Sequence, residues 1–477
     1  MCCAFVSDPA ESAALRPLGP DERIAAVADA GSVAPVNAAL AAARPSPHLV
    51  RWGIVPQEDD GVVVARATIG GAPVLVAAQD ERFLGGSAGA NHATALHGLF
   101  RVALTERPAA VLLLCASGGV RLHEANPAEL ALARALAALL DLRAAGVRVL
   151  ALCVGDVFGG AAVLACAADR IALVPAARLG VSGPKVIEEI HGKSELDAGD
   201  RAAVDVLFGA PARAAAGQVE LIADDVAAAR AWIALGGASS APFVTRIRAA
   251  HENLAARLAA TSAFDAQRPN RMSIAPPVVP IPRQLSSFYA ALVPVDGNGW
   301  LWRMPGEPVW FTRASGLGTL GPREAHAFDT ALLAHLADRG DRDRARLFVV
   351  SDSAGHESTR SAEAVCIAQY LAQHAAVLAL LRAQGVRVFG LLTGNGRGAA
   401  FFANGLQGAK VFALPSARVT AMEPSAIARV TGLDAARLRE LTDDDPLLGT
   451  PARHFAAWGG IDATLPDLAL ARLAALV

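Results

Sequence analysis

One stretch of sequence occurs twice in this chain, and the repeat limits the folds that the chain can adopt. The first copy begins at Val147 and reads VRVLALCVGDVFGGAAVLACAADRIALVP; the second begins at Val386 and reads VRVFGLLTGNGRGAAFFANGLQGAKVFALP. Each copy has an apolar strand, a glycine turn, a helix of small residues and a second apolar strand that ends at proline. A repeat of this length indicates two related domains in one chain.

Strands and helices alternate around the first copy. Gly70-Gly71 separates the apolar runs 61–69 and 73–78, which is typical of a hairpin with a two-residue turn. A continuous apolar strand follows at 109–115, and an alanine-rich helix then leads to the repeated stretch. This pattern predicts an α/β domain with buried parallel strands.

The second half has the same order of elements. Short strands are expected at 300–302 and 309–311, and a longer strand at 346–350. A helix from about 361 to 383 then leads to the second copy of the repeat. The fold class that we expect is therefore α/β, with two domains in tandem.

The length of the chain agrees with this division. A chain of 477 residues is long enough for two domains with full-sized cores. Prolines accumulate between 267 and 282, which predicts an extended linker. We expect a first domain at 1–260 that begins with a helical arm, a linker at 261–290 and a second domain at 291–477.

Composition argues against nucleic acid and membrane partners. The chain has 43 basic and 45 acidic residues and a formal net charge of −2, so it offers no excess of positive charge to phosphates or anionic lipids. No run approaches the roughly 18 apolar residues of a membrane-spanning helix. The start, MCCAFVSDPAE, lacks the basic and apolar regions of a signal peptide, so we expect a cytoplasmic protein with reduced cysteines.

The repeated glycine turn can hold negative charge. A strand that ends in a small-residue turn and opens a helix leaves backbone N–H groups without an intrahelical partner. Such fixed donors form an oxyanion hole where charge develops in a reaction. Glycine can also serve only close packing, but its occurrence at equivalent places in both copies favours function. The candidate donors are Gly159, Gly160, Gly398 and Ala399, with Gly118 and Gly119 placed to close the first pocket.

Other motifs give weaker signals. GGSAG at 85–89 fits the nucleophile-elbow pattern with Ser87 as nucleophile, but polar residues separate it from the preceding strand. GNGRGA at 394–399 fits a dinucleotide fingerprint, yet the first copy lacks it. The sequence has no phosphate-loop lysine and no zinc motif. His123 and His356 lie in strand-end loops and are second-rank candidates for proton transfer.

Several segments together match a known family. In the first half they are GIVPQEDDGVVVARATI (53–69), GGVRLHEAN (118–126), FGGAA (158–162) and LGVSGPKVIE (179–188). This half resembles the beta subunit of biotin-independent malonate decarboxylase. In the second half they are SDSAGHESTRSAEA (351–364), RGAAF (397–401) and ALPSARVTAMEPSAIARVTG (413–432). This half is similar, more loosely, to the gamma subunit, so the chain looks like a natural fusion of the two.

The resemblance implies two ββα-spiral domains of the crotonase-like carboxyltransferase group that face each other across one active site. It implies that a malonyl thioester on an acyl carrier protein loses carbon dioxide and becomes an acetyl thioester. The carrier's arm would be a phosphoribosyl-dephospho-coenzyme A group, and no biotin or metal would take part. The implied partners are the acyl carrier protein and the alpha subunit that charges it with malonate, with a homo-oligomer as a further option.

The same resemblance implies roles for individual residues. The N–H groups of Gly398 and Ala399 would hold the enolate oxygen, and those of Gly159 and Gly160 the departing carboxylate. The residues implied in substrate binding are Gly85, Gly86, Ser87, Arg121 and Phe158, with Gly118 and Gly119 in the pocket.

Two other functions stay open. One is the carboxyltransferase component of a biotin-dependent acyl-CoA carboxylase. The other is a subunit that docks the acyl carrier without catalysis, which is favoured if two departures from the family pattern have disabled the site. Asn91 stands where the beta subunit has a lysine after its glycine loop, and Ala399 stands where the gamma subunit has a second glycine.

Overall fold

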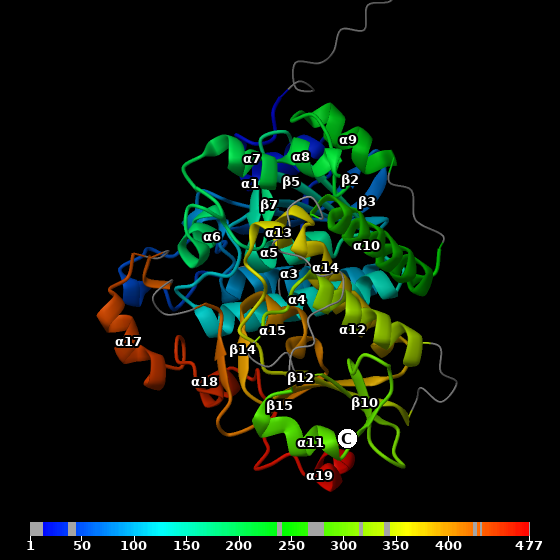
Figure 1. Ribbon diagram of the computed structural model, residues 1–477. Helices are drawn as coiled ribbons and strands as arrows, with labels where there is room; N and C mark the ends of the chain where they lie inside the picture. The colour runs from blue at the N-terminus through cyan, green and yellow to red at the C-terminus, as the bar shows by residue number, and fades with distance from the viewer. Residues whose placement is uncertain are drawn as a thin grey trace, which may run out of the picture.

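The computed structural model describes residues 13–36, 44–235, 241–265, 281–313, 318–337, 344–422, 427–429 and 432–476. Within these residues each half of the chain forms one large sheet, and two short strands form a separate pair. Figure 1 shows the first half, blue to green, in the upper part of the view and most of the second half, yellow to red, below it. The prediction of two α/β domains in tandem is confirmed.

The sheet of the first half begins with the predicted hairpin. β2 and β3 pair antiparallel around Gly70 and Gly71, whose φ values of 59° and 76° fit a turn that needs positive φ at both central residues. From β3 onwards β4, β5, β6 and β8 pair in parallel, and β7 pairs with the end of β5. The strands are β1 Ala34–Pro35, β2 Val62–Ile69, β3 Ala72–Gln79, β4 Ala110–Ser117, β5 Val149–Phe158, β6 Arg170–Leu173, β7 Leu179–Gly180 and β8 Glu220–Leu221.

The sheet of the second half repeats this arrangement. β10 and β11 are antiparallel, and β12, β13, β15 and β17 follow β11 in parallel. The single strand β5 corresponds here to two strands, β13 and β14, and β14 pairs with β16 as the end of β5 pairs with β7. The strands are β9 Val293–Pro294, β10 Leu301–Arg303, β11 Val309–Thr312, β12 Arg346–Ser351, β13 Arg387–Leu392, β14 Asn395–Arg397, β15 Lys410–Ala413, β16 Arg418–Thr420 and β17 Ala463–Thr464.

Neighbouring parallel strands need long connections, and α3, α4 and α5 provide them between β3, β4, β5 and β6. The helices of the first half are α1 Pro20–Val27, α3 Ala90–Glu106, α4 Ala125–Ala144, α5 Gly159–Cys166, α6 Pro184–His191, α7 Arg201–Phe208, α8 Ala210–Ala215, α9 Val226–Leu235 and α10 Phe243–Asp265. The alanine-rich helix expected before the repeated stretch is thus present as α4.

The helices of the second half differ from expectation at one place. The single helix expected at 361–383 is two helices, because Cys366 has a φ of 63° and interrupts the helical backbone. The helices are α11 Ser286–Ala290, α12 Pro322–His335, α13 Arg360–Ala364, α14 Ile367–Ala383, α15 Gly398–Ala403, α17 Ala435–Asp444, α18 Ala452–Ala457 and α19 Leu470–Ala475.

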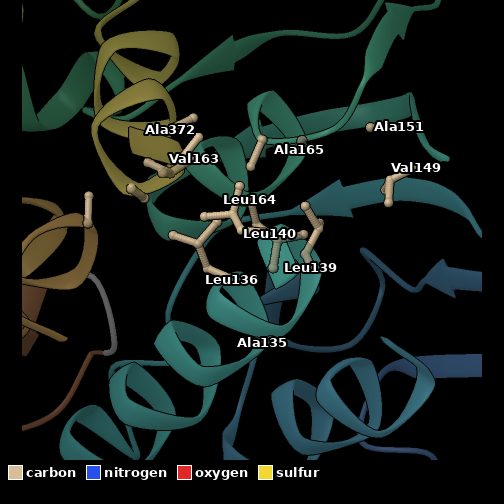
Figure 2. Close-up of a cluster of buried hydrophobic side chains, with 14 of the residues drawn as sticks. Ala135, Leu136, Leu139, Leu140, Val149, Ala151, Val163, Leu164, Ala165 and Ala372 are labelled. Carbon is tan, nitrogen blue, oxygen red and sulfur yellow. The ribbon is translucent and has the colours of Figure 1, made fainter. Parts of the chain in front are cut away.

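Four helices join the two halves in one apolar core. α4 and α5 of the first half contact α14 and α15 of the second, between the two sheets (Figure 1). Figure 2 shows Leu136 and Leu140 of α4 beside Val163 and Leu164 of α5, with Ala372 of α14 close by. These side chains are buried, and their close packing joins α4 and α5 of the first half to α14 of the second.

Two predicted segments lie partly outside the described residues. Of the N-terminal arm, the structure describes 13–36 and 44–50, which contain helix α1 and strand β1. Of the predicted linker, 266–280 lies outside; α10 extends to Asp265, and a 3-10 helix at Arg283–Leu285 leads into α11. Among the described residues, no helix combines the length and the apolar character needed to cross a membrane.

Candidate active site

Three loops of the first half meet at the carboxyl ends of the parallel strands. The N–H of Gly118 donates to the carbonyl of Gly85 at 2.9 Å, and the N–H of Ala88 donates to the carbonyl of Gly119 at 2.7 Å. A Cβ on Gly119 would lie 3.1 Å from the Cα of Gly159. The structure thus brings together the predicted glycines of 85–86, 118–119 and 159–160.

Glycine is required where these loops touch. Gly119 has a φ of 97°, and a Cβ there would lie 3.0 Å from the carbonyl oxygen of Phe158. Gly86 has a φ of 68°, and a Cβ there would overlap the carbonyl of Ala116. A side chain at either position would separate the loops from each other.

The first glycine turn has one N–H that is already occupied. Gly159 has a φ of 60° and donates to the carbonyl of Val181 at 3.1 Å. Gly160 follows as the second residue of α5, where a helix provides no acceptor for the N–H. A Cβ on Gly160 would lie 3.0 Å from Cδ2 of Leu132 and 3.6 Å from Cζ of Phe402, which belongs to α15 of the second half. Among the described residues the N–H of Gly160 therefore has no backbone acceptor, and Gly160 has apolar neighbours from both halves.

The second glycine turn has the same backbone conformation. Gly398 has a φ of 48° and begins α15, directly after β14. A Cβ on Gly398 would lie 3.0 Å from the carbonyl oxygen of Ala421. Ala399 takes the place of Gly160 and is buried, whereas Gly398 is half-buried. The N–H groups of both residues lie in the first turn of the helix.

The repeat extends to the neighbouring loops, which the sequences alone do not reveal. Ala88 forms a parallel bridge with Val120 in the first half, and Leu320 forms the same bridge with His356 in the second. The N–H of Leu320 donates to the carbonyl of Gly355 at 2.8 Å, as that of Ala88 does to the carbonyl of Gly119. His356 therefore occupies the position of Val120.

His356 joins the second turn to a loop of the first half. Its Nε2 lies 3.0 Å from Oγ of Ser182 and 3.4 Å from Oγ of Ser358. Its Nδ1 lies 3.9 Å from the position that a Cβ would take on Gly398. Burial lowers the pKa of His356 to about 4, so the free ring is neutral at physiological pH.

Glu363 fixes the loop that carries Ser182. Its Oε1 accepts the N–H of Val181 at 2.9 Å and that of Ser182 at 2.7 Å. Oε2 accepts from Arg213 at 3.3 Å, and all these groups are buried. Burial raises the pKa of Glu363 to about 7, although Arg213 and the two amides act in the opposite direction. Ser182 and Glu363 were not predicted as site residues.

Arg121, which the resemblance implies in substrate binding, lies in a buried network of ion pairs and hydrogen bonds. The side chain is fully buried, and its guanidinium is bonded to the carboxylate of Asp60, to Glu124 at 3.2 Å and to the carbonyl of Ser87 at 2.9 Å. Burial raises the pKa of Asp60 to about 6, against the effect of Arg121. Arg121 therefore ties three loops together.

The remaining candidates lie around these loops. Phe158 is half-buried, immediately before the first turn, and stacks edge-on against Phe208. The hydroxyl of Ser87 donates to the carbonyl of Leu84 at 2.8 Å, and Ser87 follows a 3-10 helix, so it does not form a strand-borne nucleophile elbow. The backbone carbonyl of His123 accepts from the indole of Trp52.

Two further sequence features have a structural explanation. Asn91 lies near the start of α3, where its amide donates to the carbonyls of Arg44 and Pro45 at 3.0 Å. In the glycine run 394–399, the carboxylate of Asp352 accepts the N–H of Asn395 at 2.9 Å. An internal carboxylate thus occupies a backbone donor that a dinucleotide site would offer to the pyrophosphate.

Two known families match the chain. Residues 20–235 match the carboxyl transferase domain, and residues 317–476 match the malonate decarboxylase gamma subunit. The first range contains the turn at Gly159, and the second contains the turn at Gly398.

Two solved structures of a malonate decarboxylase are similar to the chain. A chain of a Pseudomonas malonate decarboxylase hetero-tetramer in complex with malonate is 34% identical, with 52% of this chain and 91% of that chain covered and a TM-score of 0.47. A chain of the Pseudomonas MdcD-MdcE hetero-dimer is 30% identical, with 51% and 96% covered and a TM-score of 0.40.

The curated relatives are longer than the matching part. The malonyl-S-ACP:biotin-protein carboxyltransferase of Malonomonas rubra is 37% identical over 175 residues, which make up 33% of this chain and 55% of that protein. The acetyl-coenzyme A carboxylase carboxyl transferase subunits beta/alpha of a Parafrankia strain are 39% identical over 178 residues, 35% of this chain and 29% of that protein. The chain thus spans about half the length of the Malonomonas protein and less than a third of the Parafrankia protein.

Proposed function

Because the chain belongs to the family of malonate decarboxylase subunits and carboxyltransferase domains, we propose that it decarboxylates a malonyl thioester to an acetyl thioester. One observation carries this proposal. Two glycine turns, one in each half, begin helices that pack on each other, so that Phe402 of α15 lies 3.6 Å from the Cβ position of Gly160 in α5. The malonyl group would lie between the two turns.

The reaction needs hydrogen-bond donors for the negative charge that develops as the carbon–carbon bond breaks. Loss of carbon dioxide leaves an enolate with its charge on the thioester oxygen, and donors that meet this charge lower the barrier. The N–H groups of Gly398 and Ala399 would hold this oxygen. The N–H of Gly160 would hold the carboxylate, since the N–H of Gly159 is bonded to Val181.

The surroundings of Gly160 favour loss of the carboxylate as a neutral molecule. Leu132 and Phe402 lie at 3.0 and 3.6 Å from its Cβ position, and Val120 also lies at 3.6 Å. A carboxylate among apolar side chains loses part of its hydration, whereas carbon dioxide carries no charge and loses little. This environment would promote the cleavage of the carbon–carbon bond.

The proposed substrate is a malonyl group on an acyl carrier protein, with a phosphoribosyl-dephospho-coenzyme A arm that runs past the loops 85–87 and 118–119. We expect a separate alpha subunit to load the carrier with malonate, and the reaction to need neither biotin nor metal. We also expect the protein to act in the cytoplasm.

A direct assay tests the proposal. Purified protein is incubated with the malonyl form of an acyl carrier protein, and the mass of the carrier thioester is followed over time. We expect stoichiometric conversion to the acetyl form without biotin. Persistence of the malonyl form at equimolar enzyme would contradict the proposal.

A second candidate function is transfer of the carboxyl group to a biotin-bearing protein. The name of the Malonomonas relative, a malonyl-S-ACP:biotin-protein carboxyltransferase, supports this alternative. Adding a biotinylated carrier protein to the same assay separates the two functions. If turnover depends on biotin and carboxybiotin accumulates, transfer replaces simple decarboxylation.

A further inference from the structure

We propose that His356 delivers the proton that converts the enolate into the acetyl group, and that the hydroxyl of Ser182 is the positioning group for its ring. The inference rests on the proposed function, because it concerns the second half of that reaction. The two residues come from different halves of the chain and meet between the two glycine turns.

The geometry places the imidazole beside the expected enolate. Nδ1 of His356 lies 3.9 Å from the Cβ position of Gly398, the residue whose N–H would hold the enolate oxygen. Nε2, on the opposite side of the ring, lies 3.0 Å from Oγ of Ser182. A hydroxyl can donate to one ring form and accept from the other, so Ser182 can hold both the neutral and the protonated imidazole in place.

The loop behind Ser182 is held firmly. Ser182 is buried, and Glu363 accepts the N–H groups of Ser182 and Val181 at 2.7 and 2.9 Å. The carbonyl of Val181 in turn accepts the N–H of Gly159. The first turn, Ser182, His356 and the second turn therefore form one continuous chain of contacts.

The repeat supplies an internal comparison. Val120 takes the place of His356 in the first half, as their bridges to Ala88 and Leu320 establish. Leu179 beside Val157 corresponds to Val419 beside Gly396, so three residues later Met422 takes the place of Ser182.

One polar pair, Ser182 with His356, therefore has an apolar counterpart, Val120 with Met422. Val120 also lies 3.6 Å from the Cβ position of Gly160, where the carboxylate would be lost. The two turns are thus chemically different: one is next to a proton carrier and the other is next to aliphatic groups. This asymmetry agrees with proton delivery at Gly398 and release of carbon dioxide at Gly160.

The proton balance of the step is complete. The ring of His356 takes one proton from a solvent hydronium ion, and the negative charge that develops on the thioester oxygen at Gly398 favours the imidazolium. The carbon–carbon bond then breaks, carbon dioxide leaves, and its electron pair forms the enolate. The N–H bond at Nδ1 breaks as a C–H bond forms at the enolate carbon, and neutral His356 remains.

Hydrogen exchange isolates this step from decarboxylation. The full chain is incubated in D2O with the acetyl thioester of pantetheine, and deuterium in the methyl group is measured by mass spectrometry. Release of carbon dioxide from the malonyl thioester of pantetheine is measured in parallel. Exchange needs the proton carrier but involves no carbon dioxide, so the two rates report on different groups.

Variants of both residues decide the question. We expect His356→Asn to lower the exchange rate by about 100-fold or more, the usual effect of losing a general acid or base, and to lower carbon dioxide release less. Ser182→Ala should lower exchange, and Ser182→Thr, which keeps the hydroxyl, should restore it. Added imidazole should restore exchange in His356→Ala. His326→Asn is the matched control, because it removes a ring of α12 that stacks on His251 of α10, and it should exchange at the wild-type rate.

The outcomes are distinguishable. If the wild-type protein releases no carbon dioxide, the proposed function fails. If the wild type is active and folded His356→Asn exchanges at the wild-type rate, the proton role of His356 is overturned. If His356→Asn does not fold, Ser182→Ala and Ser182→Thr decide, because an exchange rate equal to the wild type in both would overturn the pair.

Discussion

The carboxylate of Glu363 accepts a 2.7 Å hydrogen bond from the amide N–H of Ser182, although the two residues lie 181 positions apart in the chain. The acceptor belongs to the second half and the donor to the first. The bond therefore holds the loop after β7 against α13, and it fixes the position of the Ser182 hydroxyl next to the ring of His356.

Replacing Glu363 by glutamine should destabilise the protein by about 3 kcal/mol, because it removes one partner of a buried ion pair with Arg213. Urea unfolding measures the loss. Asp141→Asn is the control, since Asp141 also pairs across the halves, with Arg382 at 3.0 Å, but is largely exposed. That change should cost less than about 1 kcal/mol. Equal losses in both variants would contradict the role of burial.

Replacing Gly398 by alanine should lower turnover by about 10-fold or more, because the new methyl group would lie 3.0 Å from the carbonyl of Ala421 and displace the turn. Its φ of 48° adds a cost of about 1–2 kcal/mol. Gly306→Ala is the matched control. Gly306 has a φ of 76° and no atom within 4 Å of a Cβ, so the variant should lose similar stability but keep its turnover. Carbon dioxide release and thermal unfolding are measured together.

Replacing Arg121 by methionine should lower the free energy of unfolding by about 3–5 kcal/mol, since the carboxylates of Asp60 and Glu124 would stay buried without their cation. Denaturant unfolding tests this. Arg82→Met serves for comparison, because Arg82 also pairs with an aspartate, Asp80, but its side chain is 62% exposed. A loss below about 1 kcal/mol in Arg121→Met would show that the arginine does not tie the loops together.

Glu129 should make the protein less stable as pH rises. Its carboxyl oxygens are buried without a hydrogen-bond partner among the described residues, and burial raises the pKa to about 8. The folded state therefore holds a proton that the unfolded chain releases above its ordinary pKa of 4.5. The stability that this proton contributes at low pH is lost as pH rises from 5 to 8, by about 4 kcal/mol if each pH unit is worth about 1.4 kcal/mol.

Urea midpoints at the two pH values measure this effect. Glu129→Gln should flatten the dependence, because an amide fills the same space without ionising. Glu252→Gln, on the exposed side of α10, should leave the wild-type dependence unchanged. A steep fall that persists in Glu129→Gln would assign the dependence to other groups.

Local patterns were sufficient for much of the fold. The hairpin at Gly70-Gly71 follows from glycines that accept positive φ, and the strands β4 and β12 follow from uninterrupted apolar runs. The break at Cys366 was not predictable in this way. The run 361–383 contains no proline or glycine, and only the packed structure imposes a φ of 63° there.

The site was predictable in its backbone but less so in its side chains. The paired turns were visible because the repeat aligns Gly159 with Gly398. Glu363 lies four residues after Thr359, which caps α13. Acidic residues are common in the first turn of a helix, so the sequence does not mark Glu363 as a site residue.

The ion pairs of Arg121 were not predictable from local pattern. Its partner Asp60 lies in another loop, and no sequence pattern connects the two residues. The equivalence of His356 and Val120 was hidden for a similar reason, because only the backbone bridges relate the two loops.

The joining of both halves in one polypeptide has a consequence for how the protein responds to dilution. A catalytic centre assembled from two separate proteins obeys mass action and is lost when their concentration falls below the dissociation constant. Here Ser182 and His356 are always present in equal number and at a concentration set by the chain itself. The turnover per molecule should therefore be the same in a nanomolar assay as in a concentrated stock.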